Sequence, residues 1–210
     1  MSEIVLYDYW RSGAAYRVRI ALGLKGLAYR SVQVDLVGGD QRGDGYRALN
    51  PLGLVPLLEM DGNRISQSLA IIDYLDARYP EPRLIPADPA ARARTLAQTL
   101  TIISEVHPLQ NLRVQTYLRD EMGQDAAAIS RWLHRWIGEG LAALEASAPA
   151  QGLFGGERPG LTDICLVPQL YSARRFELPL DPFPQLVRID EALRAMPAFA
   201  AATPEAVRPD

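Results

Sequence analysis

The amino-acid sequence predicts an α/β domain followed by an all-helical domain. Strand patterns and helix patterns alternate up to residue 80, whereas no convincing strand pattern follows residue 89. Proline and acidic residues, Pro86, Asp88 and Pro89, separate the two regions. We therefore place an α/β domain at residues 1–82 and an all-α domain at residues 88–210.

The N-terminal region begins with a βαβ unit. Residues 4–9 and 29–35 have the β-branched and alternating apolar residues of strands. Residues 14–25 between them have a helix pattern, which Gly26 ends. Because a crossover helix joins parallel strands, we expect these two strands to be parallel.

The rest of this region predicts a hairpin between two helices. A Gly-rich loop at 37–45 precedes a short helix at 46–49, and strands follow at 54–60 and 64–66. An Asp-Gly pair between these strands is a hairpin signal. The helix at 68–79 is expected because apolar residues recur at helical spacing, at Leu69, Ile71, Ile72 and Leu75. The expected order is βαβαββα.

The C-terminal region shows only helix patterns. They cover residues 90–122, 126–146, 161–176 and 185–201. The Ala- and Pro-rich residues at the end of the chain are a candidate disordered tail.

Composition and charge exclude several classes of function. The formal net charge of -3 leaves no broad basic field for nucleic acid or a membrane surface. No run of about 18 uncharged apolar residues occurs, so no membrane span is expected. One cysteine, Cys165, and two histidines rule out a disulfide framework and a thiolate-rich metal site. We expect no metal, a reducing cytoplasmic compartment and a small-molecule ligand.

The first helix carries a recognisable motif. Residues 9–22 read Tyr-Trp-Arg-Ser-Gly-Ala-Ala-Tyr-Arg-Val-Arg-Ile-Ala-Leu, which resembles the zeta-class signature of the glutathione transferases. The order of elements, with a helical domain after it, resembles the same family over essentially the whole chain. The resemblance implies a glutathione transferase fold with a thioredoxin-like first domain. It also implies glutathione as the cofactor, with Ser12 as the serine that activates it.

General physical chemistry supports that position. A helix N-terminus offers unpaired N–H groups and about half a positive charge, which favour a thiolate over a thiol. A serine hydroxyl there can donate a further hydrogen bond. The local sequence alone favours Ser12 as only the N-cap, whereas the surrounding motif favours the activating serine. Eukaryotic members usually continue Ser-Cys where this chain has Gly13 and Ala14. Glutathione must therefore supply the sulfur.

Two short motifs resemble the parts of the family that bind glutathione. Val55-Pro56 resembles the Val-Pro whose proline is cis and whose preceding backbone pairs with the cysteinyl part of glutathione. Gln67-Ser68 resembles the pair that holds the γ-glutamyl end, and a helix N-terminus suits a carboxylate. Alternatively, Pro56 only opens a strand and Ser68 only caps a helix.

A segment inside the first long helix pattern also resembles the zeta class. It reads Val-His-Pro-Leu-Gln-Asn-Leu at residues 106–112. The resemblance implies that Gln110 and Asn111 contact glutathione and that the enzyme is a homodimer. His107 is either a site residue or a structural histidine. Pro108 should bend the helix, because it cannot donate a hydrogen bond to the carbonyl of Ser104.

The helix pattern from residue 161 resembles the family's capped helix. Asp163 should reach back to the start of this helix in a structural role, with Gly160 in place of the usual Ser or Thr cap. Cys165 lies within the apolar pattern and is expected to be an inert core residue.

Three arginines are candidates for binding substrate carboxylates. Arg175 belongs to an Arg-Arg-Phe sequence that resembles the zeta-class Arg-Phe, although cations are also common at helix C-termini. Arg11 lies beside Ser12, and Arg113 lies two residues after Asn111. Several guanidinium groups around one pocket would suit a dicarboxylate.

The resemblance implies a glutathione-dependent cis–trans isomerase of aromatic and tyrosine catabolism. Its substrate would be maleylacetoacetate or the shorter maleylpyruvate, converted to the fumaryl isomer. Ser12, Arg11 and Arg175 would be catalytic, and the loop at 37–45 would be a mobile lid. Two alternatives remain, a glutathione transferase that conjugates or dehalogenates small electrophiles and a non-enzymatic binding protein on the same scaffold.

Overall fold

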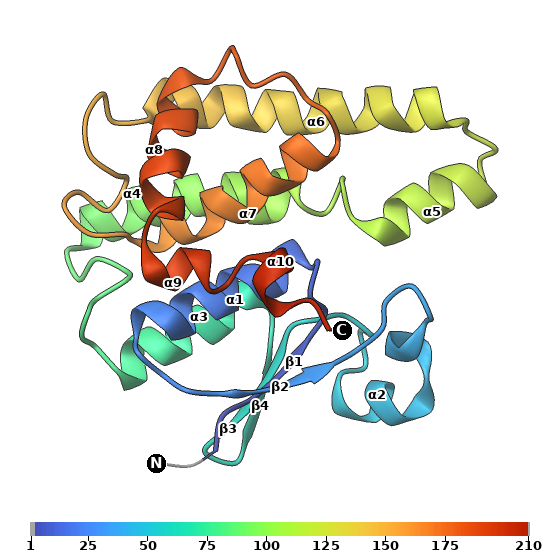
Figure 1. The fold of residues 1–210 in the computed structure, drawn as a ribbon, viewed down its shortest axis with the longest axis horizontal. Coiled ribbons are helices and arrows are strands. Elements are labelled where there is room, and N and C mark those ends of the chain that lie inside the picture. Colours follow the sequence, from blue (N-terminus) through green and yellow to red (C-terminus); the bar gives the residue numbers. More distant parts are fainter. Residues whose placement is uncertain (1–2, 210) are drawn as a thin grey trace. The chain divides into compact units, whose positions relative to one another are not determined.

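The computed structural model describes residues 3–209, which pack as two compact units (Figure 1). One unit combines Met1–Leu84 with Ala195–Asp210, and the other is Ile85–Arg194. The sequence-based division placed residues 195–210 in the helical domain, whereas in the structure this segment belongs to the first unit. The domain boundaries themselves stay a prediction.

A four-stranded sheet in the order β2-β1-β3-β4 forms the centre of the first unit. β1 is parallel to β2 and antiparallel to β3, and β3 pairs with β4 as an antiparallel hairpin. The predicted parallel pair and the predicted hairpin are both confirmed. The strands are β1 (Val5–Asp8), β2 (Arg30–Gln33), β3 (Leu57–Met60) and β4 (Asn63–Ser66).

The hairpin turn follows directly from its sequence. Asp61 and Gly62 have φ values of 51° and 75°, and two positive φ angles are what a two-residue type I′ turn requires. The strand predicted at 54–60 begins only at Leu57. Pro56 has no N–H to give to a sheet, which explains the later start.

Helices cover both faces of the sheet. On one face, α1 (Gly13–Leu24) and α3 (Ser68–Arg78) pack against each other and share a buried cluster with β1 and β3. On the other face, Tyr7 packs with Val34, Tyr46 and Val55 next to α2 (Asp44–Leu49). Because successive side chains of a strand point to opposite faces, Leu6 and Tyr7 enter different clusters. A short 3₁₀ turn, η1 (Asp40–Arg42), precedes α2.

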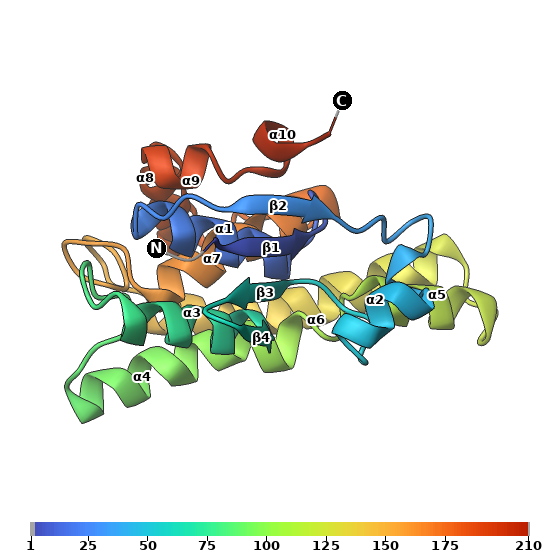
Figure 2. The ribbon, with the colours of Figure 1, turned by 90° about the horizontal axis from the view of Figure 1, so that it is seen from below.

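The end of the chain belongs to this first unit. The predicted helix at 185–201 is wrong in its length, because Pro197 starts a separate helix, α9 (Pro197–Ala200), and α10 (Pro204–Val207) follows. The candidate disordered tail is therefore folded as far as α10. α9 packs on α1, where a Cβ on Gly23 would be 3.3 Å from the Cβ of Ala198. Figure 2 shows α9 and α10 on the side of the unit that carries β2.

The second unit is helical. Its central helix is α7, which packs with α4, α8 and the π-helical turn η2. Nearly every residue of α7 is buried, including the polar residues Thr162, Asp163 and Gln169. The elements are α4 (Pro89–Leu100), η2 (Thr101–Val106), α5 (Leu112–Asp120), α6 (Ala126–Ser147), α7 (Leu161–Arg175) and α8 (Pro184–Arg194).

The predicted continuous helix at 90–122 is wrong. α4 passes into the π-helical turn, where the N–H of His107 donates to the carbonyl of Ile102 at 2.9 Å. The N–H groups of Leu109 and Gln110 both turn back to the carbonyl of Val106. Pro108 contributes no N–H in this stretch, so the helix ends here and α5 starts anew at Leu112 instead of continuing with a bend.

Candidate active site

Ser12 is the N-cap of α1. Its φ of -71° and ψ of 118° are non-helical, and its Oγ accepts a hydrogen bond from the N–H of Ala15 at 3.2 Å. The capping interpretation is therefore confirmed. The hydroxyl hydrogen, however, has no acceptor among the residues that the structure describes, and the side chain is half-buried. Ser12 can cap its helix and still donate a hydrogen bond to a ligand.

The first turn of α1 offers further donors. The N–H groups of Gly13 and Ala14 have no acceptor within residues 3–209, because no carbonyl precedes them in the helix. α1 is 12 residues long and has no acidic residue in its first turn. Its N-terminal partial charge is therefore not neutralised locally and favours an anion such as a thiolate.

A second helix N-terminus lies in the same unit. Gln67 precedes α3 with a φ of 71°, and the N–H groups of Ser68, Leu69 and Ala70 have no acceptor in the described part of the chain. Ser68 itself is 4% exposed. The Val55-Pro56 bond is cis, as the resemblance implied, and Val55 is buried beneath α2. Three unused N–H groups suit a carboxylate.

Sequence reasoning gave no role to Arg17. This side chain is 1% exposed, and its Nη1 donates to the Oγ of Ser68 at 3.3 Å. It therefore links the first turns of α1 to the N-terminus of α3 and adds a positive charge behind the N–H groups there. The sequence does contain a signal for Arg17, because this charged residue lies between Tyr16 and Val18 within a largely apolar helix pattern.

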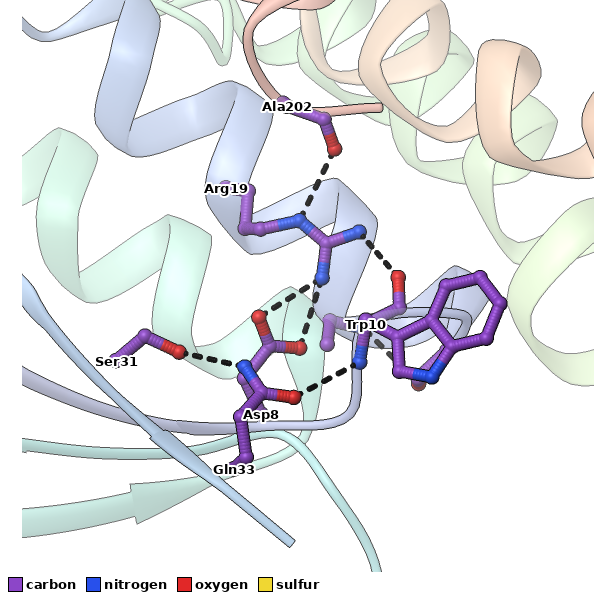
Figure 3. Close-up of polar contacts among 8 residues, drawn as sticks. Asp8, Trp10, Arg19, Ser31, Gln33 and Ala202 are labelled. Atoms are coloured by element: carbon purple, nitrogen blue, oxygen red, sulfur yellow. Dashed lines mark hydrogen bonds and ion pairs between the residues drawn. The ribbon is translucent and has the colours of Figure 1, made fainter. Parts of the chain in front are cut away.

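A buried ion pair holds the backbone that leads to Ser12 (Figure 3). Arg19 Nη1 lies 2.8 Å and 2.9 Å from the two carboxylate oxygens of Asp8, and both side chains are 1% exposed. Arg19 Nη2 donates to the carbonyl of Trp10 at 3.0 Å, and Nε donates to the carbonyl of Ala202 at 3.0 Å. The N–H of Trp10 donates to Oε1 of Gln33 at 3.2 Å. Burial raises the pKa of Asp8, and Arg19 opposes that rise.

Arg11 follows Trp10 and is half-buried. Its guanidinium carbon lies 5.2 Å from the centre of the Trp10 ring, a cation–π contact. Within residues 3–209 it forms no ion pair with a carboxylate. Its N–H donors are therefore available to a ligand.

The remaining candidates belong to the helical unit. Gln110 is 5% exposed and exchanges two hydrogen bonds with Gln169, at 3.1 Å and 2.9 Å. Asn111 caps α5, because its Oδ1 accepts from the N–H of Arg113 at 3.1 Å. Both side chains thus have structural roles, and their contact with glutathione stays a prediction. His107 is half-buried at the end of the π-helical turn, and its role also stays open.

The two arginines that end α7 differ. Arg174 pairs with the buried carboxylate of Asp190 at 2.7 Å. Arg175 is exposed, with its guanidinium carbon 4.4 Å from the centre of the Phe176 ring. Arg113 is exposed on α5. The substrate-binding roles of Arg113 and Arg175 stay predictions.

Asp163 has the predicted structural role. Its carboxylate accepts the N–H of Gly160 at 2.9 Å and those of Phe154 and Gly155 at 3.0 Å and 2.8 Å. Burial raises its pKa, and these N–H groups oppose the rise. Cys165 is fully buried in α7, as expected for a core residue.

The candidates divide between the two units. Ser12, Arg11, Val55, Gln67 and Ser68 belong to the first unit, and His107, Gln110, Asn111, Arg113 and Arg175 belong to the helical one. Within residues 3–209, no three His, Cys, Asp or Glu side chains are grouped to hold a metal ion. In the same range, no helix has the length and hydropathy needed to cross a membrane.

Known proteins resemble this chain over nearly its whole length. The model of the glutathione S-transferase N-terminal domain matches residues 6–83. Maleylacetoacetate isomerase of Pseudomonas aeruginosa is 47% identical over 208 residues, which cover 98% of this chain and 97% of that protein.

Two solved structures are also similar. The holo structure of maleylpyruvate isomerase, a bacterial zeta-class glutathione S-transferase, is 41% identical with a TM-score of 0.94, covering 97% of this chain and 98% of that one. Maleylacetoacetate isomerase from Anaeromyxobacter dehalogenans 2CP-1 is 42% identical with a TM-score of 0.87, covering 99% and 97%. That structure has dicarboxyethyl glutathione and citrate in its active site.

Proposed function

Since the chain belongs to the zeta class of the glutathione transferases, we propose that it is a glutathione-dependent cis–trans isomerase. Its substrate is maleylacetoacetate or maleylpyruvate, and its product is the fumaryl isomer. Similar proteins bear both names, at 47% and 41% identity. Recognition of the carboxylates would be alike for the two substrates, and the shape of the pocket would discriminate their chain lengths.

The residues of the first unit fit glutathione. When bound, glutathione supplies a thiolate that adds reversibly to the maleyl double bond and so allows rotation about it. The N-terminus of α3 provides three N–H groups and the Ser68 hydroxyl for the γ-glutamyl carboxylate, and buried Arg17 adds positive charge there. The backbone of Val55 would pair with the cysteinyl part.

The observation that supports the proposal most directly is the donor of the Ser12 hydroxyl, which is free within residues 3–209. This hydrogen is available, and the N–H groups of Gly13 and Ala14 are unused next to it. These donors and the partial charge of α1 lower the pKa of a thiol held at this turn, which keeps the thiolate populated near neutral pH. Arg11 would bind a substrate carboxylate and stabilise the enolate that develops during the reaction. Arg113 and Arg175 are the further carboxylate-binding residues that we predict.

Replacing Ser12 tests this proposal. We expect Ser12→Ala to lower the glutathione-dependent rate of isomerisation by at least about tenfold, the effect of losing one hydrogen bond to a charged group. The measurement is the loss of substrate absorbance with each of the two substrates, with and without glutathione. Ser66→Ala, which removes a half-buried hydroxyl from β4, is the matched control and should retain the rate.

Two results would contradict the proposal. One is an unchanged rate in Ser12→Ala. The other is no turnover of either substrate by wild-type protein that binds glutathione, which would favour conjugation or dehalogenation of another electrophile.

A homodimer and a cytoplasmic location are further parts of the proposal. Light scattering after size-exclusion chromatography tests the homodimer.

A further inference from the structure

Two guanidinium groups contact the indole of Trp10, close to Ser12 in the sequence. The guanidinium carbon of Arg11 lies 5.2 Å from the ring centre, and that of Arg208 lies 5.1 Å from the same point. Arg11 is the neighbouring residue, but Arg208 comes from the opposite end of the chain. The last residues that the structure describes therefore return to the turn that carries Ser12.

The segment that carries Arg208 is firmly packed. Phe199 is fully buried in α9, and Ala202 is 4% exposed. Pro204 is buried at the start of α10, and Thr203 caps this helix by accepting the N–H of Ala206 at 3.3 Å. The backbone is thus held by packing as far as α10, and Arg208, whose side chain is exposed, follows directly after this helix.

One buried side chain, Arg19, binds both the backbone of Trp10 and the segment that precedes Arg208 (Figure 3). Arg19 donates to the carbonyl of Trp10 and to the carbonyl of Ala202, each at 3.0 Å. Its ion pair with Asp8 orients the guanidinium group for both bonds. The turn before Ser12 and the segment before Arg208 are therefore held to the same point of the fold.

Among residues 3–209, the guanidinium groups of Arg11 and Arg208 have no anionic partner. Neither Arg11 nor Arg208 forms an ion pair or hydrogen bond with a carboxylate in the described part of the chain. Two positive charges beside one ring repel each other, and a bound anion relieves that repulsion. Stacking on an aromatic face leaves the N–H edges of a guanidinium free for bidentate contact with a carboxylate.

We propose that Arg208 is a substrate-binding residue, which forms a carboxylate-binding pair with Arg11 beside the ring of Trp10. The inference rests on the proposed function, because it assigns Arg208 to the dicarboxylate substrate of that reaction. Arg208 contributes to recognition of the substrate, whereas binding of glutathione alone does not involve it.

Calorimetric titration measures the affinity for glutathione and the affinity for a glutathione that carries two extra carboxylates, without turnover. The probes are glutathione and dicarboxyethyl glutathione, applied to full-length wild-type protein, Arg208→Gln and Arg208→Lys. We expect Arg208→Gln to bind dicarboxyethyl glutathione about tenfold more weakly, the effect of one lost charge-assisted hydrogen bond. Its affinity for glutathione should stay within about twofold, and Arg208→Lys should be intermediate.

Arg78→Gln is the matched control. Arg78 is exposed in the same unit and also stacks on an aromatic ring, with its guanidinium carbon 5.2 Å from the centre of Tyr79. Its replacement removes the same charge and should leave both affinities unchanged. In turnover, Arg208→Gln should raise KM for the maleyl substrate about tenfold with little effect on kcat.

Three outcomes would overturn the inference. They are an unchanged affinity of Arg208→Gln for dicarboxyethyl glutathione, an equal loss for both ligands, and a wild-type protein that binds the dicarboxylate no better than glutathione. Absence of isomerisation by the wild type would contradict the proposed function instead, and the binding comparison would still decide the role of Arg208.

Discussion

At the residue scale, the hydroxyl of Ser12 combines a structural and a chemical role. Its oxygen accepts the N–H of Ala15, while its hydrogen has no acceptor among residues 3–209. Loss of an N-cap costs about 1 kcal/mol of stability. Loss of a donor to a thiolate affects the reaction instead. Unfolding and rate measurements on one variant therefore separate the two roles.

The buried carboxylate of Asp190 has an environment that changes its pKa on folding. Its side chain is 0% exposed, with Oδ2 at 2.7 Å from Arg174, while Arg194 is 3.9 Å away. Neither carboxylate oxygen has a hydrogen bond of good geometry. Burial raises its pKa, opposed mainly by Arg174. The folded state therefore binds this proton more tightly than the unfolded state.

This difference predicts a pH dependence of stability. Because the pKa of Asp190 is higher in the folded state, its contribution to the free energy of unfolding increases as pH falls through the folded pKa towards 3.8, and decreases as pH rises. Asp190→Asn should remove this contribution from the slope of the free energy of unfolding against pH. Denaturant unfolding at a series of pH values measures it, with exposed Asp181→Asn as the control. The same slope in Asp190→Asn and wild type would refute the assignment.

At the scale of the elements, one close contact determines how α6 meets the π-helical turn. A Cβ on Gly140 would overlap the Cγ2 of Val106, which is 1% exposed. Gly138, one half-turn earlier on the same helix, has nothing within 4 Å of an added Cβ. The two glycines thus form a matched pair.

We expect opposite effects from alanine at these two positions. Gly140→Ala should lower the free energy of unfolding by about 1–3 kcal/mol, because the core is overpacked. Gly138→Ala should be neutral or stabilising by up to about 1 kcal/mol, because alanine favours helix and meets no neighbour. Thermal or denaturant unfolding measures both. Similar changes in the free energy of unfolding for the two variants would show that the close contact between residue 140 and Val106 does not restrict the side chain at this position.

Sequence reasoning worked where local pattern decides structure. Alternation and a two-residue Asp-Gly turn predicted the strands, and the position of Ser12 before a helix pattern indicated an N-cap, which the structure confirms. It failed at residues 101–111, where the helix changes to a π-helical turn and Pro108 then ends it. That stretch packs against α6 and α7, and helical periodicity carries no information about such tertiary contacts.

At the scale of the whole molecule, the association of distant segments was the part that sequence could not predict. The segment that starts at Ala195 belongs to the N-terminal unit, and Arg19 binds its Ala202 carbonyl. The sequence had instead predicted a helix as far as residue 201 in the helical domain, followed by a candidate disordered tail. Asp8 and Arg19 were likewise missed, because the partner of a buried charge is set by the fold. The motifs around Ser12 and Ser68, in contrast, were predictable because helix N-termini bind anions through local backbone geometry.

The central claim is that the N-terminus of α1 and the Ser12 hydroxyl stabilise the thiolate of bound glutathione. The most direct measurement is the titration of bound glutathione by the ultraviolet absorbance of its thiolate, in wild type and in Ser12→Ala. The account predicts that wild-type protein lowers the pKa of the thiol by about 2 relative to free glutathione, and that Ser12→Ala recovers about half of this difference. A bound thiol with the same pKa in both proteins would contradict it.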